Sequence, residues 1–292
     1  MPELAGAVSV RTEFDALERV AVCAPTHFFP TPPINARQEA ELRDGPPIDG
    51  DRLAEEHAGM VAALAAHGVE TVDLAPEPDA PYMLNARDPA FVVGSRLFVS
   101  RMRVDVRQME PASVEKQLRS RGLVDDAAVV ALDAGFLEGG DVIVDGGTVL
   151  CGVGERTDSV GAAGLADAVR DEFAVMEVPL ADGVLHLDTA VGLAPGLALV
   201  WPDGLAEPAS VLRYLESRGD VVTVNRRQRL GFATNYLLLG PTRALLPAGL
   251  PRVAELLAAR GIEATEVAFD EHHRSGGSIR CATMPLRRTK PG

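Results

Sequence analysis

The sequence predicts an α/β fold built from similar units that pack around a shared axis. Three observations support this prediction: short apolar runs pair across glycine turns, helical patterns end at glycines, and each helix leads into another short β-rich run. The glycine turns recur at intervals of roughly 45 to 50 residues, which is typical of a repeat protein. Because one such unit cannot bury its own apolar face, we expect neighbouring units to cover one another.

Four β-hairpins are expected where two short apolar runs flank a turn. The turns contain Gly94, Gly146, Gly196 and Gly240. An arrangement of such units around an axis leaves a central mouth lined by loops from every unit. Polar residues that are distant in the sequence can then meet there.

Helical patterns lie between the hairpins. In residues 51–68, Leu53, Met60 and Leu64 recur at a spacing that places them on one face of a helix. Pro251 suits the first turn of a later helix, where its missing N–H would have no partner. Further helices are expected over residues 113–121, 158–173 and 210–218.

Glycines mark the ends of several helices. Gly122, Gly219 and Gly261 each follow a last helical turn, where we expect the left-handed conformation that closes a helix. After each helix comes a short β-rich run that should form a further strand of the same unit. These runs cover residues 69–75, 127–132, 174–180, 220–225 and 262–267.

Composition limits the classes of function. The 292-residue chain has a formal charge of −14, which argues against nucleic-acid or anionic-membrane partners because such surfaces would repel it. The sequence contains no uncharged apolar run of about 18 residues, so no membrane span is expected. The N-terminal segment carries charges and lacks the apolar core of a signal peptide. The three cysteines are few, odd in number and widely spaced, so a reducing cytoplasm fits best.

No Pro-, Gly- or Ser-rich linker divides the chain, so we expect residues 1–292 to form a single domain. The Pro-rich stretch at residues 28–38 is better interpreted as an ordered loop over a site than as a linker. Polar clusters occur at the edges of the units. They are Asn85–Asp88, Glu138–Asp141, His186–Asp188 and Cys281.

Cys281 stands in the stretch GGSIRCATMPLRR, where Gly276 and Gly277 allow close backbone approach and Arg280 could support a thiolate. A lone cysteine is more often a buried small apolar residue than a nucleophile, so this cluster alone decides little. Cys23 and Cys151 lie in apolar β runs and are expected to be structural.

His186 and Asp188 are expected on the same face of a strand, because they are two residues apart in the run VLHLDTA. A histidine held by a carboxylate can carry a proton, although a satisfied core histidine is an equal alternative. By contrast, His272 and His273 are expected to be exposed to solvent. Glu138, Asp141 and Asp88 could each belong to a solvated turn.

Taken together, the clusters have a chemical logic. A cysteine and a histidine supply a nucleophile and a proton carrier, and several carboxylates in one mouth suit a planar guanidinium cation. Carboxylates alone would raise the pKa of the thiol, whereas a bound cation would lower it. We therefore expect a substrate-activated site with a thiouronium intermediate and loss of an amine or ammonia.

The ordered motifs resemble those of the guanidino-group modifying enzymes, the pentein superfamily. They are RDP at Arg87–Pro89, EGGD at Glu138–Asp141, HLD at His186–Asp188, and GGSIRCATMPL through Cys281. The resemblance spans nearly the whole chain. It implies a five-bladed α/β propeller of pseudo-repeated ββαβ units, with residues 1–292 as one catalytic domain.

The resemblance also implies residue roles. Cys281 would be the nucleophile, His186 the general acid and base, and Glu138 a catalytic carboxylate. Glu138 and Asp88 would hold the guanidinium, with Asp188 as a further carboxylate and Asp141 in the same acidic set. Arg107 and Arg156 match the arginines that bind the substrate carboxylate in this family, but surface ion pairs are an equal alternative.

Three functions follow as expectations. The first is a cytoplasmic cysteine-dependent hydrolase of arginine or a methylated arginine, related to dimethylarginine dimethylaminohydrolases and arginine deiminases, that releases a citrulline-type product. The second is an amidinotransferase, in which an amine replaces water. The third is a non-catalytic, ribosome-binding propeller, which the Cys–His–carboxylate set disfavours. The resemblance implies no metal or organic cofactor and a small cationic guanidine as partner, and it allows a homodimer.

Overall fold

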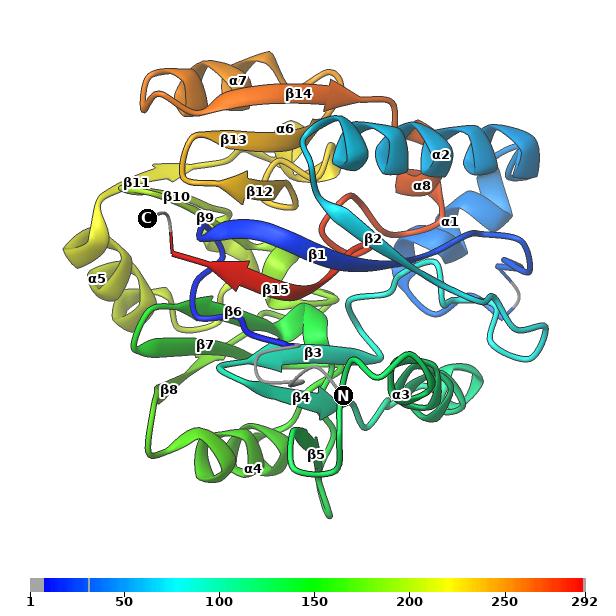
Figure 1. Ribbon diagram of the computed structural model, residues 1–292. Helices are drawn as coiled ribbons and strands as arrows, with labels where there is room; N and C mark the ends of the chain where they lie inside the picture. Colours follow the sequence, from blue (N-terminus) through cyan, green and yellow to red (C-terminus); the bar gives the residue numbers. More distant parts are fainter. Residues whose placement is uncertain (1–7, 31, 291–292) are drawn as a thin grey trace.

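The computed structural model describes residues 8–30 and 32–290, and its strands form five small sheets arranged as the blades of an α/β propeller (Figure 1). Every blade has the same plan: an antiparallel pair of strands, of which the second also pairs in parallel with a third strand. The blades are β15–β1–β2 (Met284–Thr289, Ala16–Cys23, Glu70–Leu74), β3–β4–β5 (Ala90–Val93, Arg96–Val99, Val129–Ala131), β6–β7–β8 (Val142–Asp145, Thr148–Val153, Ala174–Pro179), β9–β10–β11 (Val191–Ala194, Leu197–Val200, Asp220–Thr223) and β12–β13–β14 (Leu237–Gly240, Arg243–Pro247, Glu263–Val267).

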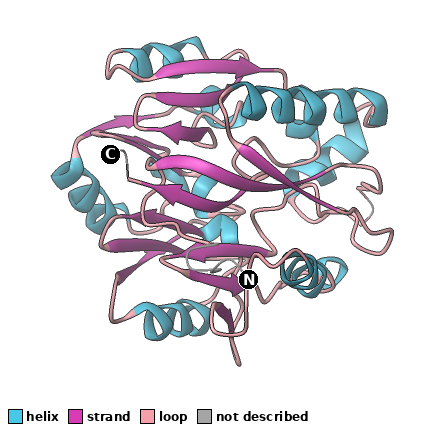
Figure 2. Ribbon diagram, viewed as in Figure 1, coloured by secondary structure: helices cyan, strands magenta, loops and turns pink. Residues whose placement is uncertain are grey.

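In each blade a helix precedes the third strand, as the repeated pattern predicted. These helices lie at the periphery of the propeller (Figures 1 and 2). They are α2 (Gly50–Ala66), α3 (Glu110–Ser120), α4 (Ser159–Val169), α5 (Pro208–Arg218) and α7 (Pro251–Ala258). Across the described residues, none of the helices has the length and apolar character that a membrane crossing requires.

The blade that closes the ring joins the two ends of the chain. Strand β1 pairs antiparallel with β15, so that Ala21 faces Met284, and Figure 1 shows these two strands side by side. The sequence pattern predicted the other four hairpins because their strands are neighbours in the chain. It gave no signal for this pairing, which joins residues more than 260 positions apart (284 − 21 = 263).

The apolar core is divided among the interfaces between blades. One cluster contains Ile143 and Leu150 from one blade together with Val191 and Val200 from the next. The first strands β3, β6, β9 and β12 are buried along their whole length. The expectation that each unit covers the apolar face of its neighbour is therefore confirmed.

Two glycine predictions had different outcomes. Gly122 and Gly261 have φ values of 65° and 71°, the left-handed conformation expected after a helix. Gly219, however, has φ 160° and ψ −158°, which is extended backbone, so the prediction was wrong there. A Cβ at Gly219 would lie 2.4 Å from the backbone carbonyl carbon of Gly196, so close packing requires this glycine.

Three further helices and four 3₁₀ turns complete the described chain. The helices are α1 (Ala36–Asp44), α6 (Arg226–Leu230) and α8 (Asp270–Arg274), and the turns are η1 (Asp105–Arg107), η2 (Gly139–Asp141), η3 (Leu187–Thr189) and η4 (Pro202–Gly204). We call residues 32–44, which end in α1, the strap. The Pro-rich loop predicted at residues 28–38 thus continues into a helix, and its residue 31 lies outside the described residues.

Candidate active site

Each blade has a polar residue just before its first strand. The five residues at this position are Asp88, Asp141, Asp188, Asn235 and Cys281. The propeller therefore brings together groups that are far apart in the sequence, as the repeat pattern suggested. Asn235 was missed by the sequence analysis, although its place before an apolar hairpin strand matches the other four.

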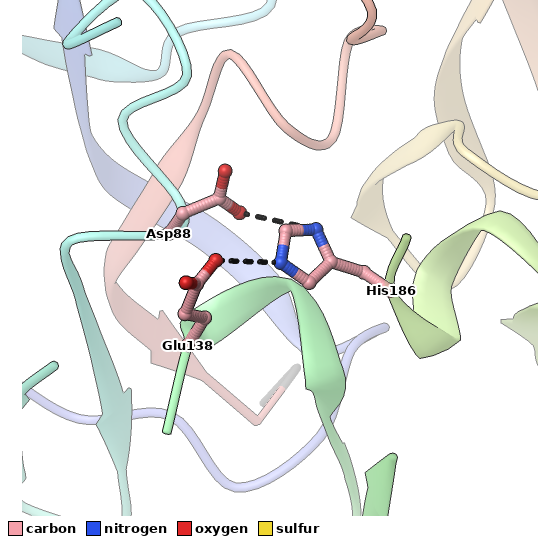
Figure 3. A group of neighbouring side chains, drawn as sticks. All are labelled: Asp88, Glu138 and His186. Atoms are coloured by element: carbon pink, nitrogen blue, oxygen red, sulfur yellow. Dashed lines mark hydrogen bonds and ion pairs between the residues drawn. The ribbon is translucent and has the colours of Figure 1, made fainter. Parts of the chain in front are cut away.

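His186 lies between two carboxylates. Its Nε2 is 2.9 Å from Oε2 of Glu138, and its Nδ1 is 3.8 Å from Oδ1 of Asp88, so the acids approach opposite ring nitrogens (Figure 3). Burial alone lowers the pKa of His186, but the carboxylates of Asp88, Asp141 and Glu138 outweigh it and raise the pKa to about 9. The imidazole is therefore protonated at neutral pH.

Glu138 is fully buried and both of its oxygens have partners. Oε1 accepts the backbone N–H of Arg103 at 3.1 Å, and Oε2 faces His186 and lies 3.5 Å from Nη1 of Arg156. Burial would raise the pKa of Glu138, but these charges and Arg107 outweigh it and lower the pKa to about 2. Glu138 is thus a permanent anion beside the imidazolium.

Asp88 is held by Arg107, a side chain that the structure buries almost completely. Nη1 of Arg107 lies 2.6 Å from Oδ2 of Asp88, and its Nε and Nη2 donate to Glu110 at 3.0 Å and 2.8 Å. Burial raises the pKa of Glu110 to about 7 in spite of this contact. Arg107 and Arg156 therefore both have carboxylate partners within the protein.

Asp141 connects two of the loops. Its Oδ1 accepts the backbone N–H of Leu187 at 2.9 Å, and its Oδ2 accepts the hydroxyl of Thr157 at 2.7 Å. Burial raises the pKa of Asp141 to about 7. Because Leu187 follows His186 directly, this contact fixes the backbone that carries the imidazole.

The prediction that His186 and Asp188 share a strand face was wrong. The strand begins only at Val191, and His186 precedes the 3₁₀ turn η3 that contains Asp188. The bond from the Leu187 N–H to Asp141 accounts for this, because it directs the backbone amide away from a sheet partner. His186 consequently contacts Glu138, whereas Asp188 forms an ion pair with Arg280.

Gly140 gives the imidazole room. A Cβ at this position would lie 2.6 Å from Nδ1 of His186 and 2.9 Å from Oδ1 of Asp88. A Cβ at Gly139 would lie 2.1 Å from the carbonyl oxygen of Arg87. The two glycines of the EGGD motif thus permit an approach that any larger residue would block.

Cys281 is buried beside Asn235 and Asp188. The amide Nδ2 of Asn235 lies 3.3 Å from Sγ, and Oδ2 of Asp188 lies 4.0 Å from it. Burial raises the pKa of the thiol well above its usual range, and the carboxylates of Asp188 and Asp88 raise it further. The same carboxylate of Asp88 thus acts on both Cys281 and His186.

Arg280 was expected to stabilise a thiolate at Cys281, but its guanidinium binds other groups. Its Nη1 donates to Oδ2 of Asp188 at 2.8 Å, and its Nη2 donates to Glu13 at 3.1 Å and to the carbonyl of Val142 at 2.9 Å. The guanidinium is therefore already paired with two carboxylates. Burial, Asp188 and Asp88 together raise the pKa of the Cys281 thiol.

Two buried carboxylate oxygens lack a donor. Among residues 8–30 and 32–290, nothing donates a hydrogen bond to Oδ1 of Asp88 or to Oδ1 of Asp188. Leaving a buried charged acceptor unpaired costs about 1–3 kcal/mol or more. Both oxygens belong to the carboxylates that raise the pKa of Cys281, and they could accept hydrogen bonds from a cation with several N–H donors.

The strap lies against the loops that carry these groups. The carbonyl of Ile34 accepts a hydrogen bond from Nη2 of Arg156, and Nε2 of Gln38 donates to the carbonyl of Ser275. A Cβ at Gly276 would lie 2.6 Å from Nδ2 of Asn35. The Pro-rich stretch was therefore correctly placed next to the cluster.

Asp88, Glu138 and His186 offer ligand atoms that lie within 4.8 Å of one another, a spacing that a metal ion could use. Arg107 and Arg156 already supply positive charge to the two carboxylates. A protonated His186 supplies a third positive charge between them. The arrangement therefore favours a proton on the imidazole over a metal ion at this position.

His272 and His273, expected at the surface, are buried, so that prediction was wrong. His272 stacks on Phe269 with ring centroids 4.5 Å apart, and His273 stacks on Phe232 at 4.7 Å. The pattern gave no sign of this, because the aromatic partners Phe269 and Phe232 come from outside the short helix α8.

A thiol, an imidazole and acids at the centre of a five-bladed α/β propeller define the class of the guanidino-group modifying penteins. Comparison with known proteins agrees. The model of the family described as "N,N dimethylarginine dimethylhydrolase, eukaryotic" matches residues 28–288, and the chain belongs to this family.

Two sequence relatives and two solved structures illustrate the similarity. The uncharacterized protein YkgA of Bacillus subtilis is 32% identical over 95% of this chain and 94% of its own. A dimethylarginine dimethylaminohydrolase of Streptomyces coelicolor is 31% identical over 82% of this chain and 88% of its own.

The solved structures share the fold at low identity. The N-terminal domain of the cyanobacterial arginine dihydrolase ArgZ has a TM-score of 0.83 at 22% identity, covering 94% of this chain and 98% of that domain. The amidinotransferase SxtG of Microseira wollei has a TM-score of 0.82 at 20% identity and covers 98% of both chains. The fold prediction is thereby confirmed.

Proposed function

We propose that this pentein is a cysteine-dependent hydrolase that cleaves a guanidinium C–N bond of arginine or a substituted arginine. The observation that carries the proposal is a pair of buried oxygens, Oδ1 of Asp88 and Oδ1 of Asp188, that accept no hydrogen bond from the described residues and belong to the two carboxylates that raise the pKa of Cys281. A guanidinium offers five N–H donors in a plane, which suits two such oxygens at once.

Substrate binding would also activate the nucleophile. In the free protein, burial and two carboxylates keep Cys281 as a neutral thiol. A guanidinium bound by Asp88 and Asp188 neutralises those carboxylates and brings positive charge close to the sulfur. The thiol proton is then released to solvent, and the thiolate forms only when a substrate is present.

The reaction proceeds in two steps. The thiolate of Cys281 attacks the guanidinium carbon, a C–S bond forms, and the imidazolium of His186 protonates the departing nitrogen as the C–N bond breaks. Neutral His186 then takes a proton from water, and the resulting hydroxide attacks the thiouronium carbon. As the C–S bond breaks, the new hydroxyl group loses its proton to become the ureido carbonyl, and the released thiolate takes up a proton. The products are an amine or ammonia and a citrulline-type ureido compound, and both residues return to their initial states.

The remaining residues position these groups. Glu138 keeps His186 protonated until the leaving group needs the proton, and Arg107 fixes Asp88. Asp141 holds the backbone next to His186. Binding of a substrate carboxylate by Arg107 and Arg156 stays a prediction. Each arginine would have to bind that carboxylate in addition to the acidic residues with which it already forms ion pairs.

Mass spectrometry with a panel of guanidines tests the proposal. Arginine, monomethylarginine and dimethylarginine would be incubated with the protein, and both the products and an adduct on Cys281 would be recorded. Cys281→Ser should lower turnover by about 10⁴-fold or more, because the covalent step is lost. Undiminished turnover by this variant would refute the proposal, and transfer of the amidino group to an added amine in preference to water would identify an amidinotransferase.

A further inference from the structure

Glu13 is a buried carboxylate in a segment that contacts three blades. The residues before it form isolated bridges: Ser9 with β15, Val10 with the turn between β3 and β4, and Thr12 with β6. The N–H of Glu13 donates to the carbonyl of Val144 at 2.9 Å, and the N–H of Val144 donates to Oε1 of Glu13 at 3.3 Å. These bonds fix the carboxylate inside the propeller, and neither step of the proposed reaction uses it.

A single arginine joins Glu13 to the candidate active site. Nη2 of Arg280 donates to Oε1 of Glu13 at 3.1 Å, and Nη1 of Arg280 donates to Oδ2 of Asp188 at 2.8 Å. The same Oδ2 lies 4.0 Å from Sγ of Cys281. Glu13 and Asp188 therefore share one guanidinium, so a change in the charge of Glu13 alters the electrostatic surroundings of the carboxylate beside the thiol.

Glu13 also balances two further buried arginines. Nη2 of Arg87 lies 3.9 Å from Oε2 of Glu13, and within the described part of the chain nothing accepts a hydrogen bond from Nε or Nη2 of Arg87. The guanidinium of Arg288 donates to two backbone carbonyls, at 2.7 Å and 2.8 Å. Burial would raise the pKa of Glu13, but these two arginines and Arg280 outweigh it and lower the pKa to about 2. Glu13 is therefore an anion among three arginines at neutral pH.

Without this anion, the positive charge of the arginines would have two effects on the site. It would favour the thiolate of Cys281, because nearby cations lower the pKa of a thiol. It would also weaken the binding of a cationic substrate, because like charges repel strongly where water is excluded. Asp188 and Asp88 oppose both effects, since both raise the pKa of Cys281, but Asp188 already shares Oδ2 with Arg280. The charge of Glu13 thus preserves the negative character of the acids that face Cys281.

We propose that Glu13, through Arg280, is a positioning residue that keeps Cys281 a neutral thiol in the free protein and leaves Oδ1 of Asp188 available to a cationic substrate. The part that concerns the substrate rests on the proposed function. The part that concerns the thiol does not, because the reactivity of the thiol can be measured without turnover. Glu13 acts at a distance, since its carboxylate accepts hydrogen bonds from Arg280 and Val144.

The test measures alkylation of Cys281 by iodoacetamide in the full-length wild type and in Glu13→Gln at pH 8. Mass spectrometry of the peptides separates Cys281 from the buried Cys23 and Cys151. Glu13→Gln should be alkylated about 10-fold faster, because a thiol pKa that is one unit lower gives about ten times more thiolate. For arginine, KM should rise about 10-fold while kcat changes less than about 3-fold, whereas a loss of packing alone would not speed up alkylation.

Three variants separate charge from packing. Glu13→Asp keeps the charge and should be alkylated within about 3-fold of the wild-type rate. Asp15→Asn removes a buried acid that lies near Arg288 instead of Arg280, and it should also stay within about 3-fold. Arg87→Gln removes a cation but keeps the backbone N–H that donates to the carbonyl of Cys281, so alkylation should slow about 10-fold. Combining Arg87→Gln with Glu13→Gln should restore the wild-type rate.

An unchanged or slower alkylation of Glu13→Gln, or a double variant that stays as fast as Glu13→Gln, would overturn the role of Glu13. If Glu13→Gln does not fold, Arg87→Gln decides, and alkylation at or above the wild-type rate contradicts the inference. If the wild type turns over no guanidine, the proposed function fails, and the alkylation rates still decide whether Glu13 controls the thiol.

Discussion

Two buried histidines of this propeller have opposite acid–base properties. His186 has its pKa raised to about 9, whereas burial, with help from His57 and His273, lowers the pKa of His272 to about 3. Their exposed fractions are 1% and 0%, so burial is equal and cannot explain the contrast. The charged groups near each imidazole account for the difference in pKa.

Carboxylates surround one imidazole and are kept from the other. His186 faces Glu138 and Asp88 at 2.9 Å and 3.8 Å, and the carboxylate oxygens at these distances accept no backbone N–H. Next to His272, the carboxylate of Glu56 accepts the backbone N–H groups of Glu271 and His272, each at 2.9 Å. Glu56 thus binds backbone N–H groups of α8, and the imidazole of His272 stays neutral.

The difference has a consequence for stability as pH changes. A raised pKa means that His186 stabilises the fold below its unfolded value of about 6.5, and that this contribution is lost as pH rises through about 9. A lowered pKa means that His272 must stay neutral in the fold. Its effect appears as a loss of stability when pH falls from about 6.5 toward about 3.

The largest expected effect comes from removing the acid that charges His186. Glu138→Gln should lower the pKa of His186 below about 9 and decrease kcat by about 10²- to 10⁴-fold, because the imidazole then lacks its proton when the amine departs. NMR titration of the imidazole and the pH dependence of kcat would measure both quantities.

Glu110→Gln is the matched control for this variant. Glu110 is an equally buried glutamate, but it contacts Arg107 instead of the imidazole. It should leave the His186 pKa much closer to the wild-type value. If both variants shift the imidazole equally, the direct contact with Glu138 is not the cause of the raised pKa.

A smaller effect is expected at the neutral histidine. His272→Phe should remove part of the acid sensitivity, making the loss of unfolding free energy between pH 6.5 and pH 4.5 about 2 kcal/mol smaller than in the wild type. Urea denaturation at the two pH values measures it. The difference at pH 8 reports the altered packing on Phe269 alone, and an identical acid loss in both proteins would contradict the prediction.

The architecture could be predicted from the sequence because its determinants are local. Glycine turns such as Gly94 and Gly196, and helix ends such as Gly261, require particular backbone conformations that leave a visible residue. The closing blade could not be predicted, because the pairing of β1 with β15 depends on ring closure. Gly219 was assigned the wrong conformation, because tight packing on Gly196 and helix closure both select glycine.

The sequence predicted which residues belong to the site, but it did not predict which of them contact one another. Glu138, Asp88 and His186 do meet, because each lies in a segment that leads into the first strand of a blade. Which carboxylate pairs with which cation depends on three-dimensional proximity, so the partners of Arg107 and Arg280 left no trace in the spacing. Asn235 escaped notice because an amide has neither the charge of Asp88, Asp141 and Asp188 nor the reactive thiol of Cys281.

The smallest effect tests whether a more distant acid also contributes to the charge of His186. Asp141 interacts with the imidazole through space, but its own oxygens are held by Leu187 and Thr157, and its pKa of about 7 leaves it only partly ionised at neutral pH.

Asp141→Asn keeps an acceptor for the Leu187 N–H, so we expect kcat to fall only about 2- to 10-fold, with a smaller decrease of the His186 pKa than Glu138→Gln causes. The pH dependence of kcat for the two variants gives the comparison. Asp145→Asn is the control, because this buried aspartate of β6 binds Arg218 and Tyr214 instead of the His186 loop. A larger pKa decrease in Asp141→Asn than in Glu138→Gln would mean that the field of several acids, and not the 2.9 Å contact, sets the proton affinity of His186.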